Sequence, residues 1–202
     1  MLITAINGSP NLTGNTAFLL SQALQECREM DCEIAIINCQ EALRGLKTPF
    51  CKACSSPCTA KCLEGKELQK AYDLLSRSDG IIAGSPVYFG TVSGQYKAFW
   101  DKSRSLRTGK KLLNIAGGAL TVGGSRFGGQ ETTLRAIHDI FLVQGMIIVG
   151  DGYYENDCGH LGAAGQRPAE EDNNAILRAR ILGRRVAQVA RATQNIRSNY
   201  VK

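Results

Sequence analysis

The fold of this chain is decided by the stretch LITAINGSPNLTGNT at residues 2–16. Its first part, residues 2–6, is a short apolar run, and a loop rich in Gly, Ser, Thr and Asn follows at residues 7–16, here called the first loop. Apolar spacing typical of a helix begins directly behind that loop. A short apolar run without polar alternation is typical of a strand buried on both faces. The stretch therefore predicts a buried strand that leads through the loop into a helix.

The same pattern recurs along the chain. Further apolar runs occupy residues 34–37, 80–83, 112–116 and 146–149, and helical spacing occupies residues 16–30, 65–77, 93–104, 130–144 and 170–193. Five strands alternating with helices predict a parallel sheet with helices on both faces. Small molecules bind such sheets beyond the carboxyl ends of the strands. We therefore expect the functional site in the loops that follow residues 6, 84 and 118.

Composition agrees with one α/β domain over residues 1–202. The 202 residues are 44% hydrophobic and 21% charged, which excludes a disordered tail protein. No apolar run is long enough to cross a bilayer, and no charged leader precedes the first strand. We expect a cytoplasmic protein without a membrane partner.

The net charge of +6 comes from one terminal segment. No acidic residue follows Asp172, whereas seven of the 24 basic residues do, which leaves 17 basic against 18 acidic residues elsewhere. A solvated helix face explains such a segment, and a docking surface for an acidic partner is the second interpretation. No nucleic-acid-binding motif is present, so no nucleic-acid partner is expected. The seven residues are Arg178, Arg180, Arg184, Arg185, Arg191, Arg197 and Lys202.

The first loop has the composition of a phosphate-binding loop. Backbone N–H groups, hydroxyls and a helix N-terminus are the donors that an anion requires. The loop matches neither G-x-G-x-x-G nor G-x-x-x-x-G-K-[ST] and contains no Lys or Arg. This favours the phosphate monoester of a fixed cofactor over a nucleoside triphosphate. An ordinary turn with Asn15 or Thr16 as the helix N-cap is the alternative.

Two further loops follow strands at the same predicted edge. The second loop (residues 84–93) brings aromatic side chains there, and the third loop (residues 121–131) contains four glycines. Glycine lets the backbone approach a flat ring closely, so that N–H groups can hydrogen-bond its carbonyl edge. Each loop alone is a common turn, but three at successive strand ends predict a cofactor site.

These loops resemble those of the flavodoxin-like NADPH-dependent FMN reductases, and among them the iron–sulfur flavoproteins. The matching residues are Gly8-Ser9-Pro10, Gly14-Asn15-Thr16, Ser85-Pro86-Val87-Tyr88 and Gly128-Gly129-Gln130-Glu131. The resemblance implies a flavodoxin-like five-stranded sheet in the order 2-1-3-4-5 and non-covalently bound FMN. Because the flavin carries the redox chemistry, no catalytic side chain is expected.

The resemblance also implies where FMN binds. The residues expected at its phosphate are Ser9, Asn11, Asn15 and Thr16. Those expected along one side of the isoalloxazine are Pro86, Val87, Tyr88, Phe89 and Gly90, and those near its other edge are Thr121, Gly123, Gly124 and Ser125. His138 falls within a predicted helix and is expected to be structural.

Four cysteines crowd into residues 51–62, here called the cysteine segment, with the spacing C-x2-C-x3-C-x3-C. The segment lies in an irregular insertion at about residues 40–63, after the second strand. Its spacing would also place four thiols on one face of a helix, but Pro57 opposes a straight helix there. A folded-back loop can bring four thiolates together, and [4Fe–4S], Zn and free thiols are all compatible with it.

Iron–sulfur flavoproteins carry a compact four-cysteine run in this insertion that binds a [4Fe–4S] cluster. Their usual spacing is C-x2-C-x2-C with a looser last gap, so this chain has one extra residue in the middle gap. The resemblance implies that the cluster ligands are Cys51, Cys54, Cys58 and Cys62.

The leading hypothesis is a flavin-dependent oxidoreductase of the iron–sulfur flavoprotein type. Electrons would pass between a [4Fe–4S] cluster, FMN and a small-molecule acceptor, with a ferredoxin-like donor. The resemblance implies a homodimer or homotetramer in which the cysteine segment lies close to a neighbouring flavin. The alternative is an NAD(P)H-dependent FMN or quinone reductase without a cluster, and a third hypothesis is a non-catalytic sensor that binds flavin or metal.

Overall fold

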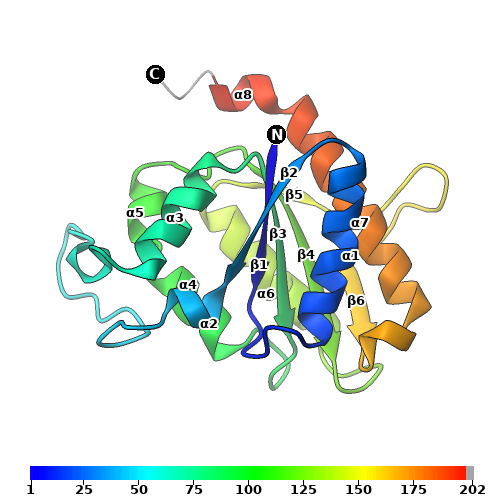
Figure 1. The fold of residues 1–202 in the computed structure, drawn as a ribbon, viewed down its shortest axis with the longest axis horizontal. Helices are drawn as coiled ribbons and strands as arrows, with labels where there is room; N and C mark the ends of the chain where they lie inside the picture. Colours follow the sequence, from blue (N-terminus) through cyan, green and yellow to red (C-terminus); the bar gives the residue numbers. More distant parts are fainter. Residues whose placement is uncertain (199–202) are drawn as a thin grey trace.

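The computed structural model of the chain describes residues 1–198. A parallel sheet lies between two layers of helices (Figure 1). Its strands are β1 (Leu2–Asn7), β2 (Glu33–Asn38), β3 (Gly80–Pro86), β4 (Ala116–Gly123), β5 (Ile147–Val149) and β6 (Ala163–Gln166).

The strand order is β2-β1-β3-β4-β5, and β6 also pairs with β4. The order 2-1-3-4-5 predicted from the sequence is confirmed, with one strand more than predicted. The start of β4 pairs with β5 at Ala116–Gly118, and the end of β4 pairs with β6 at residues 120–123. β5 and β6 therefore occupy successive halves of the same edge of β4.

Helices cover both faces of the sheet. The side chains of Ile3 and Ile82 belong to the core under α1 and α7, whereas those of Ile6 and Ile81 belong to the core under α3, α4 and α6. These helices are α1 (Asn15–Glu29), α3 (Glu67–Arg77), α4 (Gly94–Asp101), α6 (Gln130–Val143) and α7 (Asn173–Ala192). The shorter elements are α2 (Cys39–Ala42), α5 (Arg104–Thr108), α8 (Gln194–Ser198) and the 3₁₀ helices η1 (Lys61–Leu63) and η2 (Ala169–Glu171).

The fourth strand lies later in the chain than predicted. The sequence predicts a strand at residues 112–116, whereas β4 begins at Ala116 and continues through two glycines. A Cβ atom on Gly117 would lie 2.7 Å from the side chains of Met146 and Phe141, and one on Gly118 would lie 2.7 Å from Val186. Side chains that pack directly onto the strand leave no room for a Cβ atom at either position, so both residues are glycine. The two glycines therefore lie within the strand and do not mark its end.

The basic terminal segment lies mostly on α7, which packs along α1. The guanidinium of Arg180 donates to Gln22 Oε1, and that of Arg184 forms an ion pair with Glu26 at 2.8 Å. A Cβ atom on Gly183 would collide with the backbone of α1, so glycine lets the two helices approach closely. The segment therefore fastens the last long helix to the first.

Two further arginines of the segment pair with carboxylates of the chain. Arg178 forms an ion pair with Asp157, and Arg197 forms one with Asp79 at 2.8 Å. Lys202, which the sequence assigns to the same segment, lies outside the described residues. Three terminal arginines, Arg178, Arg184 and Arg197, are thus neutralised within the chain.

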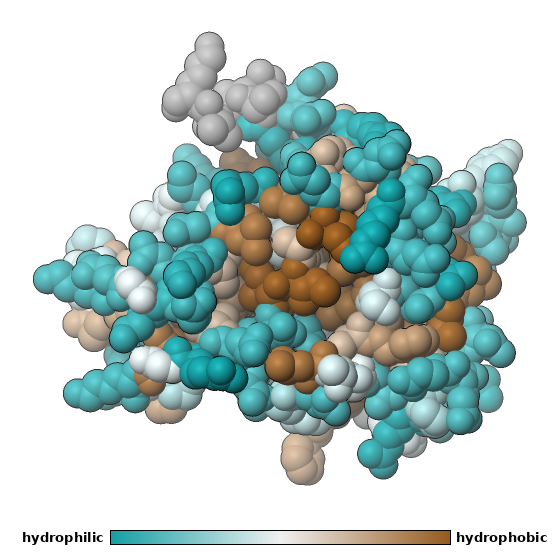
Figure 2. All heavy atoms as spheres, viewed as in Figure 1, coloured by the Kyte–Doolittle hydropathy of each residue, from teal (hydrophilic) through white to brown (hydrophobic). Residues whose placement is uncertain are grey.

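The surface is largely polar, with an apolar area near the middle of the view in Figure 2, over the β2 side of the sheet. β2 lies at the end of the strand order, and its Ile36 is 54% exposed. Within residues 1–198, no helix combines the length and the apolar character needed to cross a membrane.

Candidate functional site

The three predicted loops lie together at the carboxyl edge of the sheet, because β1, β3 and β4 are parallel neighbours. Gly8 N donates to Gly84 O at 2.8 Å and joins the first loop to the second. Thr121 Oγ1 donates to Ser85 O at 2.7 Å and joins the second loop to the third. Ser93 is buried, and its hydroxyl donates to Gly8 O. The three loops therefore form one connected surface.

In the first loop, the acceptor atoms of the polar side chains are used within the chain. Asn7 Oδ1 accepts from Ser9 N at 3.0 Å, Ser9 Oγ accepts from Asn11 N at 3.1 Å, and Asn11 Oδ1 accepts from Thr13 N at 3.1 Å. The Ser9 hydroxyl proton and the Asn11 amide protons make no hydrogen bond to another described residue. A loop whose remaining groups are donors fits an anion.

The N-terminus of α1 faces this loop without a cap. α1 begins at Asn15 with Gly14 at the N-cap position, and within residues 1–198 no side chain caps it and no acidic residue lies in its first turn. Asn15 and Thr16 are therefore not N-caps, contrary to the alternative interpretation of the sequence. Asn15 Oδ1 accepts from Ala169 N at 2.7 Å, which leaves the Asn15 amide protons as donors. An uncapped helix N-terminus among such donors fits a phosphate monoester.

The second loop ends in a tight hairpin. Tyr88 and Thr91 exchange backbone hydrogen bonds of 2.9 and 3.2 Å, and the residues between them, Phe89 and Gly90, have φ values of 50° and 77°. A phenylalanine in the left-handed region is strained, because its Cβ atom crowds the backbone. The Phe89 side chain is fully exposed and Tyr88 is 44% exposed, whereas Pro86 and Val87 are half-buried at the base. The hairpin therefore presents aromatic surface beside the other two loops.

The third loop is held by Gln130, which was not among the predicted site residues. Its side chain is buried, with Nε2 donating to Ser125 O at 2.6 Å and Oε1 accepting from Gly128 N at 2.8 Å. A Cβ atom on Gly123 would collide with the Gln130 amide, so a side chain at that position would displace Gln130 from its hydrogen bonds. The motif Gly-Gly-Gln-Glu contains the signal for this role, because a polar residue at the start of a helix can bond the preceding loop.

The predicted residues of the third loop differ in exposure. Gly124 and Ser125 are exposed, so both can approach a ligand. Thr121 is fully buried, and its hydroxyl donates a hydrogen bond to Ser85 O. The Thr121 side chain therefore fixes β4 against β3 beneath the loops.

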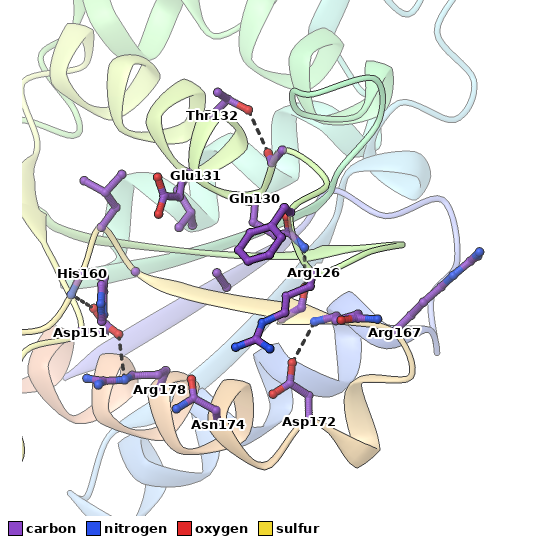
Figure 3. Close-up of a pocket in the computed structure, with 18 of the residues that line it drawn as sticks. Arg126, Gln130, Glu131, Thr132, Asp151, His160, Arg167, Asp172, Asn174 and Arg178 are labelled. Carbon is purple, nitrogen blue, oxygen red and sulfur yellow. Dashed lines mark hydrogen bonds and ion pairs between the residues drawn. The ribbon is translucent and has the colours of Figure 1, made fainter.

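A groove of about 930 Å³ opens beside the third loop, along β6 between α6 and α7 (Figure 3). It meets that loop at Arg126 and Phe127. At its other end, Asp151 is fully buried and lies 3.6 Å from Arg178 Nε. Hydrogen bonding from Arg178 lowers the pKa of the neighbouring Asp157 to about 2. The groove is thus polar and charged, in contrast to the aromatic second loop.

The cysteine segment is irregular over residues 51–60, as Pro57 predicts, and η1 begins only at Lys61. Cys51 is half-buried, and the thiols of Cys54, Cys58 and Cys62 are exposed. Among residues 1–198, no three His, Cys, Asp or Glu side chains are arranged to hold a metal ion. Four thiols within twelve residues suit a metal–sulfur cluster in their chemistry, but their arrangement in this structure does not bring them together.

Three further titratable groups, Cys27, Cys39 and His138, have structural positions. Burial raises the pKa of the Cys27 thiol to about 12 and raises that of Cys39 as well. His138 is buried on α6, and burial lowers its pKa. All three lie in the packed interior, apart from the loops.

Comparison with known proteins agrees with this geometry. Residues 1–160, which contain all three loops and the cysteine segment, match the NADPH-dependent FMN reductase family. The chain belongs to this family. As a member of the NADPH-dependent FMN reductases, it is a flavin-dependent oxidoreductase with an FMN-dependent redox function.

Individual relatives extend the comparison beyond residue 160. The chain is 39% identical over 196 residues to an iron–sulfur flavoprotein of Methanocaldococcus jannaschii, covering 95% of this chain and 98% of that protein. It is 34% identical over 130 residues to an NAD(P)H dehydrogenase (quinone) of Chromohalobacter salexigens, covering 58% of this chain and 65% of that one. A WrbA-like flavodoxin of Agrobacterium tumefaciens shares the fold, with a TM-score of 0.66, 22% identity and coverage of 95% and 98%.

Proposed function

We propose that this chain is an FMN-dependent redox protein of the iron–sulfur flavoprotein type, in which Cys51, Cys54, Cys58 and Cys62 bind a [4Fe–4S] cluster. When bound, the cluster exchanges single electrons and FMN exchanges one or two, so that together they connect a one-electron donor to a small acceptor. The observation that carries the proposal is the donor set, four thiols within twelve residues of a chain that also forms a flavin site.

The cysteine segment has features that suit a cluster. It belongs to a part of the chain that projects beside α2 and α4 (residues 43–66, cyan in Figure 1). Ala53 and Ala60 have φ values of 48° and 57°, and such left-handed residues reverse the direction of a loop. Lys52 and Lys61 lie between the cysteines and offset the negative charge of thiolate ligands. The relative named an iron–sulfur flavoprotein aligns over nearly the whole chain.

The three loops have separate tasks toward FMN. The donors of the first loop and the N-terminus of α1 bind the phosphate. Exposed backbone at Gly124 and Ser125 orients the carbonyl edge of the ring. The side chains of Tyr88 and Phe89 exclude water from the side of the ring on which they lie.

We further propose a homodimer or homotetramer in which the cysteine segment of one subunit lies near the flavin of another. Phe89 and Phe127 are 107% and 94% exposed beside the site, and Ile36 exposes apolar surface on the edge strand β2. Large apolar side chains exposed in this way are typical of contact surfaces. A ferredoxin-like donor suits one-electron entry, but the ion pairs of Arg178, Arg184 and Arg197 leave less free positive charge on the basic terminal segment than the sequence suggests.

The test is an anaerobic absorption spectrum with iron and acid-labile sulfide measured per subunit. We expect flavin bands with a broad shoulder near ~400 nm and about four irons and four sulfides per chain. The variants Cys54→Ser and Cys58→Ser should lose the iron and keep the flavin. Cys158→Ser is the matched control, because Cys158 is also an exposed free thiol but lies outside the segment. An iron-free protein after anaerobic reconstitution would contradict the proposal.

The second candidate is an NAD(P)H-dependent FMN or quinone reductase without a cluster. It is favoured by the separation of the four thiols in this structure and by the relative named an NAD(P)H dehydrogenase (quinone). Anaerobic NADPH would then bleach the flavin of iron-free protein without a mediator. In that case, Cys54→Ser and Cys58→Ser would leave both the bleaching and the iron content unchanged.

A further inference from the structure

A fourth segment, which lies beyond the family match over residues 1–160, contacts two of the FMN loops. It runs from the end of β6 into η2. Arg167 N donates to Gly123 O at 3.0 Å in the third loop, and Ala169 N donates to Asn15 Oδ1 at 2.7 Å beside the first loop. Gln130 Nε2 adds a longer bond of 3.4 Å to Gly165 O. The backbone of Arg167 is therefore fixed between the loop for the phosphate and the loop for the ring.

The Arg167 side chain extends over the third loop. A Cβ atom built on Gly124 would lie 3.6 Å from Arg167 Nε and 3.8 Å from Cζ and Nη2. In Figure 3 the side chain points away from the end of the groove that holds Asp151 and Arg178. Because Gly124 has no side chain, one face of the guanidinium lies against exposed backbone where the flavin ring is expected.

Within residues 1–198, the guanidinium of Arg167 has no ion pair and donates no hydrogen bond, unlike those of Arg178, Arg184 and Arg197. The nearby carboxylate of Asp172 is already used, with Oδ2 accepting from Gln166 N and Oδ1 accepting from Ala175 N. An arginine with a fixed backbone and an unpaired head group can give all its donors to a ligand.

The FMN loops provide little positive charge of their own. Residues 7–16 and 84–93 contain no Lys or Arg, and residues 121–131 contain only Arg126. The Arg126 guanidinium lies over the ring of Phe127, with its Cζ 5.7 Å from the ring centroid. FMN carries negative charge on its phosphate, and its ring gains negative charge at the N1–C2=O edge on two-electron reduction. Arg167 lies at the loop assigned to the ring.

We propose that Arg167 is the cation of the FMN site and that its guanidinium binds the N1–C2=O edge of the flavin ring. It is a positioning residue that favours reduced over oxidised FMN. The proposal rests on FMN binding at the three loops and is independent of the cluster. It adds a positive charge to a site whose first and second loops contain no Lys or Arg.

The experiment measures the dissociation constants of FMN and riboflavin for protein stripped of flavin, in oxidised and dithionite-reduced forms under argon. The variants are Arg167→Gln, Arg167→Lys and the matched control Arg126→Gln. We expect Arg167→Gln to lower the preference for reduced over oxidised flavin about ten-fold, since hydrogen bonds to charged groups contribute on this scale. Arg167→Lys should keep part of the preference, because it retains the charge without the planar fork. Arg126→Gln should change it less than about two-fold.

Riboflavin separates a ring contact from a phosphate contact. The proposal requires the same loss of preference with riboflavin as with FMN. A loss confined to FMN would assign Arg167 to the phosphate and overturn the proposal, and so would unchanged affinities in Arg167→Gln. The thermal midpoint checks folding and should stay constant, because the guanidinium has no partner within the described chain. Iron content, measured in parallel, reports separately on the cysteine segment.

Discussion

The FMN loops and the cysteine segment are both loops of one chain, but they are ordered in different ways. Hydrogen bonds such as Gly8 N to Gly84 O and Thr121 Oγ1 to Ser85 O join the FMN loops to the sheet and to one another. Within the cysteine segment, the hydrogen bonds are local, from Ala53 N to Cys51 Sγ and from Thr59 N to Ser55 Oγ. The protein fold determines the first region, whereas the second is held by local bonds, as expected if the proposed cluster orders it.

Thiol labelling provides the sharpest test of this difference, with the largest expected effect. In iron-free native protein at pH 7, the exposed Cys54, Cys58 and Cys62 should react with iodoacetamide at least ~100-fold faster than Cys27. Burial keeps the Cys27 pKa at about 12, so almost no thiolate forms there. Mass spectrometry of tryptic peptides gives the rate for each cysteine.

Iron reconstitution should then protect the thiols of the cysteine segment and leave Cys158 reactive, since Cys158 is exposed elsewhere. Equal labelling of Cys54 and Cys158 after reconstitution would contradict the view that the cysteine segment is ordered by a bound cluster.

The next largest effect should follow from adding one methyl group to the FMN loops. A Cβ atom on Gly8 would lie 2.9 Å from Gly84 O and from the Tyr96 side chain, so Gly8→Ala must displace backbone. We expect at least about ten-fold weaker FMN binding and a loss of about 1–3 kcal/mol of unfolding free energy. Flavin fluorescence and urea denaturation measure these quantities.

Gly94→Ala is the control for Gly8→Ala, because a Cβ atom on Gly94 would meet no atom within 4 Å. Iron content should be unchanged in both variants. Normal FMN affinity in the Gly8→Ala variant would show that the loops are less rigidly joined than their hydrogen bonds indicate.

A smaller effect is expected from Gln130→Ala. The substitution leaves Ser125 O and Gly128 N without the side-chain partner that holds the third loop. FMN binding should weaken about five- to ten-fold, with about 1–2 kcal/mol of unfolding free energy lost. The exposed neighbour Glu131 provides the control, Glu131→Ala, for which binding should change less than about two-fold. A weaker effect in Gln130→Ala than in Glu131→Ala would show that contacts other than those of Gln130 hold the third loop in place.

The smallest effect concerns pH and the helix that holds the third loop. Burial places the pKa of His138 in folded α6 below its ordinary value of 6.5. The unfolded chain therefore binds the proton more readily, and stability should fall as the pH drops through 6.5 toward the folded pKa. Urea midpoints between about pH 7.5 and 5.5 should decline more steeply in the wild type than in His138→Gln. Parallel curves would show that His138 contributes nothing to the pH dependence.

The sequence predicted the placement of the FMN loops well, because strand periodicity and loop composition are both local signals. Residues 2–6 and 80–83 are apolar without alternation, and each is followed by a Gly- and Ser-containing loop at the edge where parallel strands end. The strand prediction was less accurate at residues 112–116. There, Gly117 and Gly118 resemble a strand end, and the side chains that require them come from distant helices.

Arg167 could not be assigned to the site from the sequence for the same reason. Its relation to Gly124 depends on the pairing of β6 with β4, and β6 is a four-residue strand with little apolar character. Gln130 was visible in a quoted motif, but its bonds to Ser125 and Gly128 depend on the path of the third loop. Long-range pairing and loop path are what a single sequence leaves open.

The packing of α7 along α1 has a consequence for how the protein is made. The helix behind the first loop is held by Arg180 and Arg184, and each of these arginines follows its partner on that helix by 158 residues, so it is synthesised long after the first loop. Asn15, the first residue of this helix, likewise accepts a hydrogen bond from a residue far along the chain, Ala169. A chain truncated before α7 would therefore keep the hydrogen bonds that join the three loops to one another, but it would lose the helix that holds α1 and with it the firm placement of the helix N-terminus at the first loop.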